Sequence, residues 1–175
     1  FNEEKHYWNF KSSLCSNLEK FNLADINFLF GKLIEYCVAK TMYLPGIDPI
    51  FDNELFEIYR TMVSKKYYET ETNKYFPPDL YRNIIIQSTK VNELSWLEDF
   101  IQNYGMYLHP ERKSDIINFS YAHLYFERNV YEKSLEFLSR IKMEEFSYAI
   151  DAKCLYVKNY YEQEDYDAAY SYIKS

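Results

Sequence analysis

Apolar residues recur at intervals of three and four along most of this chain, the spacing that places them on one face of an α-helix. The pattern runs from Glu3 to Lys20 and again, over a broader stripe, from Leu23 to Tyr43. Leu44-Pro45-Gly46 then supplies a helix end. These segments predict two helices, of which the second is buried on more than one side.

The remaining pattern predicts seven further helices and no strand. Asp52, Asp79 and Asn92 are placed to cap three of them, and Gly105 is expected in the left-handed conformation after a helix end. Because most connections are short, neighbouring helices should pack antiparallel. The expected ranges are about 53–70, 79–90, 93–104, 110–128, 130–142, 145–163 and 165 to the end.

Composition supports an all-α domain. The 175 residues include only 3 Gly and 5 Pro, too few for the many tight turns of an all-β protein. Hydrophobic residues make up 47% and charged residues 27%, a balance typical of a globular chain. The chain is therefore long enough and apolar enough to form one domain with a substantial core.

A repeat is visible near the end of the sequence. The stretch YFERNVYEKSLEFL at 125–138 is echoed by YYEQEDYDAAYSYI at 160–173, a spacing of 35 residues. Both stretches predict a helix, a tight turn and a second helix, and stacked hairpins of this kind share a continuous core. The matching positions are Tyr121 and Tyr156, Tyr125 and Tyr160, Tyr131 and Tyr166, Ser134 and Ala169, and Leu138 and Ile173.

A weaker unit lies 37 residues upstream, where Ile84, Ile85 and Leu94 align but the small residues are absent. We therefore divide the sequence into residues 1–75, a helical region of degenerate repeats or a capping bundle, and residues 76–175, which carry the repeats. The two parts are expected to form one continuous domain. Because the chain starts without Met and stops in a helix without a capping signal, we expect a fragment truncated at its C-terminus.

The repeated segments resemble tetratricopeptide repeats, most clearly over residues 115–175. That family places a large apolar residue, a small one and an aromatic in its first helix, then an aromatic, a small and a large residue after the turn. Here Tyr121, Ala122 and Tyr125 take the first three places, and the second repeat follows the same order. Two departures are the bulky Val157 at a small position and Glu164 at a turn position that usually holds Gly.

The resemblance implies about nine helices stacked as a right-handed α-solenoid, with the first helix of each pair lining a concave groove. In this family the groove usually binds an extended peptide or a helix of a partner protein. We expect partly exposed aromatic residues there, although Phe119 and Phe126 could instead pack against the next repeat. The groove residues carried over are Phe119, His123, Phe126, Glu127, Cys154, Lys158, Tyr161 and Glu162.

No catalytic, cofactor-binding or metal-binding constellation stands out, and we predict that the chain is not an enzyme. His6, His109 and His123 are scattered, without a nucleophile at a recognisable spacing. An acidic cluster at 162–167 could hold a cation, but it lacks a calcium-loop glycine and is better explained as a solvated turn where Asp165 and Asp167 stabilise a helix N-terminus.

The three cysteines, Cys15, Cys37 and Cys154, are far apart and unpaired by any CxxC spacing. Each lies among apolar residues and is interpreted as a small core residue, which favours a reducing compartment and a cytoplasmic location. No apolar run reaches the length of about 20 residues that spans a bilayer.

The function best supported by these patterns is a non-catalytic interaction scaffold that binds a protein or peptide partner. A first alternative is self-assembly, in which the open ends of the stack form a homodimer of a larger regulatory protein. A second is a helical-repeat nucleic-acid binder, which the net charge of −7 disfavours because phosphate contacts require a basic surface.

Overall fold

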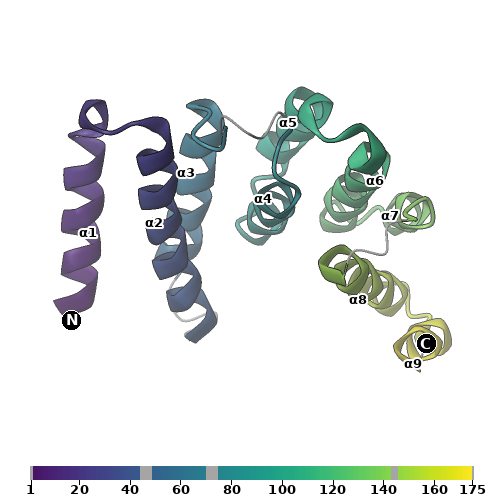
Figure 1. The fold of residues 1–175 in the computed structure, drawn as a ribbon. Coiled ribbons are helices and arrows are strands. Elements are labelled where there is room, and N and C mark those ends of the chain that lie inside the picture. The colour runs from purple at the N-terminus through teal and green to yellow at the C-terminus, as the bar shows by residue number, and fades with distance from the viewer. Residues whose placement is uncertain (1, 44–48, 70–74, 143–145, 175) are drawn as a thin grey trace. The chain divides into compact units, whose positions relative to one another are not determined.

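The computed structural model describes residues 2–43, 49–69, 75–142 and 146–174, and these residues are all-helical, with no strand among them. The expected helix end at Leu44-Pro45-Gly46 lies outside the described residues. The chain divides into two compact units, residues 1–74 and 75–175. Figure 1 shows the helices of both units.

The first unit is a group of three helices in which α2 (Leu23–Tyr43) packs against both α1 (Asn2–Cys15) and α3 (Ile50–Ser64). A 3-10 turn, η1 (Leu18–Lys20), follows α1. Most of the predicted apolar stripe of α2 and part of that of α1 form the interior, as three- and four-residue spacing allows. The stripe residues Phe10, Phe21 and Leu23 are exposed, so the prediction is wrong for these three. The buried side chains of this unit include Tyr7, Leu14, Ile26, Phe30, Leu33, Phe51, Leu55, Ile58, Tyr59 and Met62.

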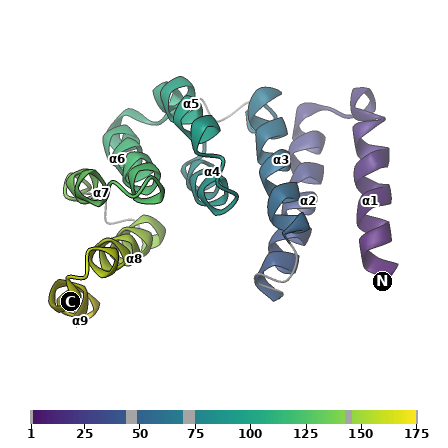
Figure 2. The ribbon, with the colours of Figure 1, turned by 180° about the vertical axis from the view of Figure 1, so that it is seen from behind.

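The second unit consists of three helix pairs. The pairs are α4 (Pro78–Lys90) with α5 (Leu94–Tyr104), α6 (Pro110–Glu127) with α7 (Tyr131–Leu138), and α8 (Phe146–Glu162) with α9 (Tyr166–Lys174). Within each pair the two helices pack on each other, and α6 also contacts α4, α5 and α8. Both views of the ribbon show α8 beside α7 (Figures 1 and 2).

The turn inside each pair has the same backbone geometry. Asn92, Asn129 and Glu164 are all left-handed, with φ of 59°, 58° and 60°. The backbone N–H of Asn129 donates to the carbonyl of Phe126, and the N–H of Glu164 donates to that of Tyr161 in the equivalent position. A left-handed residue with such a bond is a common helix C-terminus. The 37- and 35-residue spacings of the sequence therefore recur in the structure.

Ring contacts repeat as well. Tyr121 stacks on Phe137 with centroids 5.2 Å apart, and Tyr156 stacks on Tyr172 at 4.5 Å. Across the turn, the pair Phe126–Tyr131 and its counterpart Tyr161–Tyr166 both have centroids 5.7 Å apart. The hairpins α6–α7 and α8–α9 are therefore built from the same internal contacts, as the 35-residue spacing predicts.

Several predicted helix signals are wrong. Asp52 and Asp79 lie in the first turns of α3 and α4 rather than before them, and Asn92 occupies the left-handed turn instead of capping α5. Gly105 is right-handed, with φ −58°, and begins the 3-10 turn η2 (Gly105–Tyr107). An added Cβ at this position would lie 3.2 Å from Cδ1 of Ile117, a tight contact that the Ile117 side chain would have to relieve. Local signals identify chain reversals here but not the residue that makes them.

Candidate functional site

The eight residues expected to line a groove lie on α6 and α8, but the structure does not expose all of them. Phe119 is completely buried and His123 is buried, so the prediction that these two line an open groove is wrong. Phe126 is half-buried. The remaining five are exposed, namely Glu127, Cys154, Lys158, Tyr161 and Glu162. Exposure of Cys154, and of Cys15, also contradicts their interpretation as core residues.

Phe119 and His123 belong to the contact between α6 and α8. The Phe119 ring meets that of Tyr148 edge-on at 4.9 Å, and the His123 ring lies 4.5 Å from Phe119. Burial, helped by the nearby charges of Lys158 and Arg82, lowers the pKa of His123 from 6.5 to about 3. His123 is therefore a neutral interior side chain at physiological pH.

A buried polar network holds α8 in this position. The Ser134 hydroxyl donates to the carbonyl of Ala122 at 2.8 Å, and the Asn159 amide donates to Ser134 Oγ at 2.9 Å. Asn159 also donates to the carbonyl of Leu155. Both polar side chains are fully buried. Because a buried amide without partners is costly, these bonds fix the position of α8 on the preceding hairpin. Asn159 was not among the predicted site residues. Its only signal in the sequence is that a polar residue lies on the same helix face as the apolar residues Ala152 and Leu155.

An ion pair adds to this contact. The Arg82 guanidinium on α4 donates to the Asp151 carboxylate on α8 at 2.6 Å, and both side chains are mostly buried. The Tyr148 hydroxyl donates to the carbonyl of Pro78 at 2.8 Å. The same face of α8 is therefore anchored to two earlier helix pairs.

The open side of the last hairpin contains a pocket of about 430 Å³. Lys158 and Cys154 line it, and both were expected to contact a partner. Around them lie exposed Lys153 and half-buried Val157 of α8. The wall opposite is formed by Tyr172 and Ile173 of α9. The exposed part of the predicted groove is thus continuous with a hollow that has an apolar floor and a basic rim.

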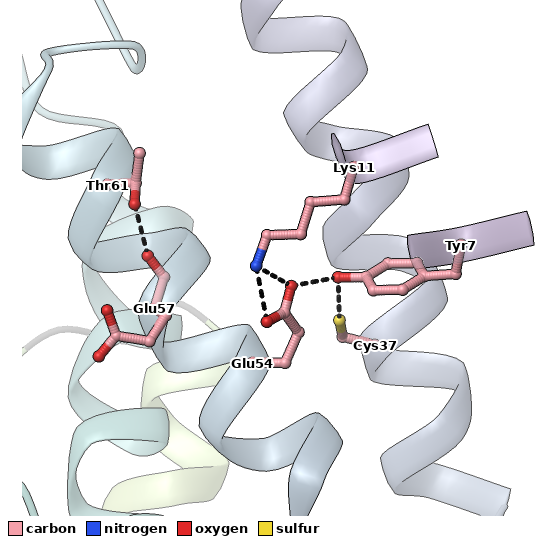
Figure 3. Close-up of polar contacts among 6 residues, drawn as sticks. All are labelled: Tyr7, Lys11, Cys37, Glu54, Glu57 and Thr61. Carbon is pink, nitrogen blue, oxygen red and sulfur yellow. Dashed lines mark hydrogen bonds and ion pairs between the residues drawn. The ribbon is translucent and has the colours of Figure 1, made fainter. Parts of the chain in front are cut away.

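The first unit holds a different cluster, in which four titratable side chains from three helices meet (Figure 3). The Tyr7 hydroxyl donates to Glu54 Oε1 at 2.6 Å and lies 3.2 Å from Cys37 Sγ, while the Lys11 ammonium donates to Glu54 Oε2 at 2.7 Å. Burial raises the pKa of Cys37 to about 11, so this thiol is protonated at neutral pH and a poor nucleophile. Tyr7, Cys37 and Glu54 are buried, and the cluster joins α1, α2 and α3.

The acidic cluster at 162–167 forms a helix start. Asp165 Oδ1 accepts a hydrogen bond from the backbone N–H of Ala168 at 3.1 Å, the geometry of an N-cap. Over the described part of the chain, no group of three His, Cys, Asp or Glu side chains is arranged to hold a metal ion. Asp165 therefore has a structural role that needs no cation.

No protein-family model, curated protein or solved structure matches this chain. Within the described ranges, each helix is too short or too polar to cross a lipid bilayer.

Proposed function

We propose that this chain is a non-catalytic protein-binding module. Its helix pairs stack as a short, tetratricopeptide-like α-solenoid, and the exposed surface of the last two pairs binds a helix or peptide of a partner protein. The geometry of the turns and ring contacts, repeated at 35 residues, supports stacking of equivalent units.

The observation that carries the proposal is the concentration of exposed apolar side chains on the last hairpin. Tyr161, Tyr166, Tyr170 and Ile173 are each more than half exposed, at 61%, 58%, 60% and 67%. Contiguous apolar surface marks interaction sites, and Tyr supplies a large contact area with little loss of side-chain entropy. Charged neighbours, including Lys158 and Glu162, supply the polar rim that a protein interface requires.

A selection of displayed peptides on the immobilised chain tests this proposal. We expect the wild-type protein to enrich a set of related sequences. The double variant Phe126→Ala/Tyr161→Ala should bind them about tenfold more weakly, since aromatic anchors carry much of the binding energy. Both aromatics lie at the same turn position of successive pairs.

The control variant is Met106→Ala, which removes a 66% exposed apolar side chain from η2, outside the proposed surface. It should keep wild-type affinity. Circular dichroism should show the same helix content in all three proteins. Equal affinity of the double variant, or no enrichment by the wild type, would contradict the proposal.

A further inference from the structure

The pocket on the last hairpin has a counterpart in the hairpin before it. Subtracting 35 from its lining residues gives Asn118, Phe119, Ala122, His123, Phe137 and Leu138. Phe119, Ala122 and Leu138 are 0%, 0% and 2% exposed. The surface that is buried on α6–α7 is thus the same surface that is open on α8–α9.

The helix that covers the earlier surface is α8, and its contacts show how. Tyr148 packs on Phe119, Ala152 and Leu155 join the core around Ala122 and Leu138, and Asn159 bonds to Ser134. The four contacting residues of α8 are four, three and four positions apart, which is one face of a helix. The packing of α8 on α6–α7 therefore shows which kind of helix can cover a surface of this shape.

Substitutions between the two surfaces define how a second occupant must differ. Cys154 replaces Phe119 and is smaller, which leaves room for a larger side chain opposite it. Ala169 replaces Ser134, so no hydroxyl is present to bond an amide such as that of Asn159. The occupant consequently needs a bulky residue at the position of Tyr148 and an apolar one at the position of Asn159.

Charge adds a third requirement. Lys153 and Lys158 replace Asn118 and His123 at the edge of the pocket, and both are exposed. Among the residues that the structure describes, neither lysine has a carboxylate within ion-pairing distance. A helix that covers the pocket brings its flanking residues next to these two ammonium groups, and acidic flanks complement them.

We propose that the α8–α9 face binds an amphipathic helix of a partner protein, one whose apolar face is flanked by acidic residues. The helix occupies on α8–α9 the place that α8 occupies on α6–α7. The proposal rests on the protein-binding function proposed above and specifies the site and the chemistry of the partner.

A second copy of the chain fits this face less well. In a two-fold symmetric contact the same patch meets itself, so Lys153 and Lys158 of one copy would lie against the same lysines of the other. Repulsion between like charges disfavours that arrangement. An acidic partner helix gains attraction from the same two residues.

Two synthetic helical peptides provide the test, measured by fluorescence anisotropy with the chain 1–175. Both carry Trp, Ala, Leu and Leu at the positions of Tyr148, Ala152, Leu155 and Asn159, and they differ only in having Glu or Lys on the flanks. We expect the Glu peptide to bind about tenfold more tightly than the Lys peptide.

Charge reversal sharpens the test. The variant Lys153→Glu/Lys158→Glu should bind the Lys peptide better than the Glu peptide, a swap that general loss of structure cannot produce. Lys5→Glu/Lys65→Glu changes the net charge equally at exposed sites of the first unit and should keep the wild-type preference.

Equal binding of both peptides, absence of binding, or an unchanged preference in the charge-reversed variant would overturn the docking site. So would a concentration-dependent dimer that Val157→Arg disrupts, because the face would then belong to a second copy. If the synthetic peptides fail while displayed peptides still depend on Phe126 and Tyr161, only this docking site is lost. If neither the synthetic nor the displayed peptides bind, the proposed protein-binding function is contradicted together with the docking site.

Discussion

The hairpins α6–α7 and α8–α9 have the same internal contacts, but the outer face of the first is covered by another helix and that of the second is exposed. Rings pack in the same way inside each, as in Tyr121 on Phe137 and Tyr156 on Tyr172. Yet Leu138 is buried, whereas its counterpart Ile173 is 67% exposed. The comparison separates two sources of structure. Contacts within a hairpin follow from residues close in sequence, while burial of its outer face depends on whether another helix lies against it.

The two hairpins differ at many positions, and these include the positions where that helix packs. Positions that form internal ring contacts stay aromatic, but Phe119 becomes Cys154 and His123 becomes Lys158. A side chain covered by α8 must be apolar or neutral, since burying a charge without a partner is costly. Lys158 lies on the exposed surface, so its charge remains solvated and carries no such cost.

The largest expected effect is the loss of stability when a fully buried residue of α6–α7 is truncated and its exposed counterpart on α8–α9 is not affected. Phe119→Ala should destabilise the protein by about 3–5 kcal/mol, because it leaves a cavity between α6 and α8. The equivalent change Cys154→Ala should cost less than about 0.5 kcal/mol at an exposed site. Urea denaturation followed by circular dichroism measures both, and similar losses would contradict the difference in burial.

The next largest effect is the dependence of the free energy of unfolding on pH. Because burial lowers the pKa of His123 from 6.5 to about 3, the unfolded chain binds a proton between these values that the native protein does not. The stability contributed by neutral His123 is fully present above pH 6.5 and is lost as the pH falls towards 3. The slope in this window approaches about 1.4 kcal/mol per pH unit.

His123→Leu should remove that slope between pH 6.5 and 5, where few carboxyl groups titrate. His6→Gln, at an exposed site of the other unit, should retain it. Denaturation midpoints at several pH values measure the slope. An equal slope in wild type and His123→Leu would show that the buried imidazole does not control it.

The smallest expected effect is the gain in stability when the left-handed residue of each turn is replaced by glycine. Glu164 has a φ of 60°, a conformation that strains residues with a Cβ, and Glu164→Gly should stabilise the protein by about 1 kcal/mol. Asn129→Gly should gain less, because Asn tolerates this conformation better and Asn129 Oδ1 also accepts a hydrogen bond from the Tyr131 hydroxyl. Thermal unfolding measures the shifts, and a lower melting temperature for Glu164→Gly would contradict the strain.

Helices and the repeat were predictable because their signals are local. The stripe of α2 and the spacing between Tyr121 and Tyr156 are visible in the sequence without knowing what packs on them. Gly105 shows the limit of such signals, since its backbone is right-handed and its close neighbour is the side chain of Ile117 on another helix. A glycine after a helix indicates a reversal but does not distinguish a left-handed turn from a crowded one.

The candidate site was predicted only in part, for the same reason. Periodicity places Phe119, Phe126 and Tyr161 on the first helices of successive pairs, but only the structure shows that α8 covers the first of them. The bond from Asn159 to Ser134 spans 25 residues, and Tyr7 meets Glu54 across 47. No sequence spacing marks either pair, because neither lies within one helix or one turn.

It follows from the order of residues alone that this chain forms helices, where most of them lie, and that one hairpin pattern is repeated after 35 residues. These properties depend on backbone preferences and on neighbours three or four positions away. Which of the equivalent residues are interior and which form a surface depends on how the helices pack, because solvent exposure is a property of the folded chain. The same pattern of residues is therefore a core on α6–α7 and an open face on α8–α9.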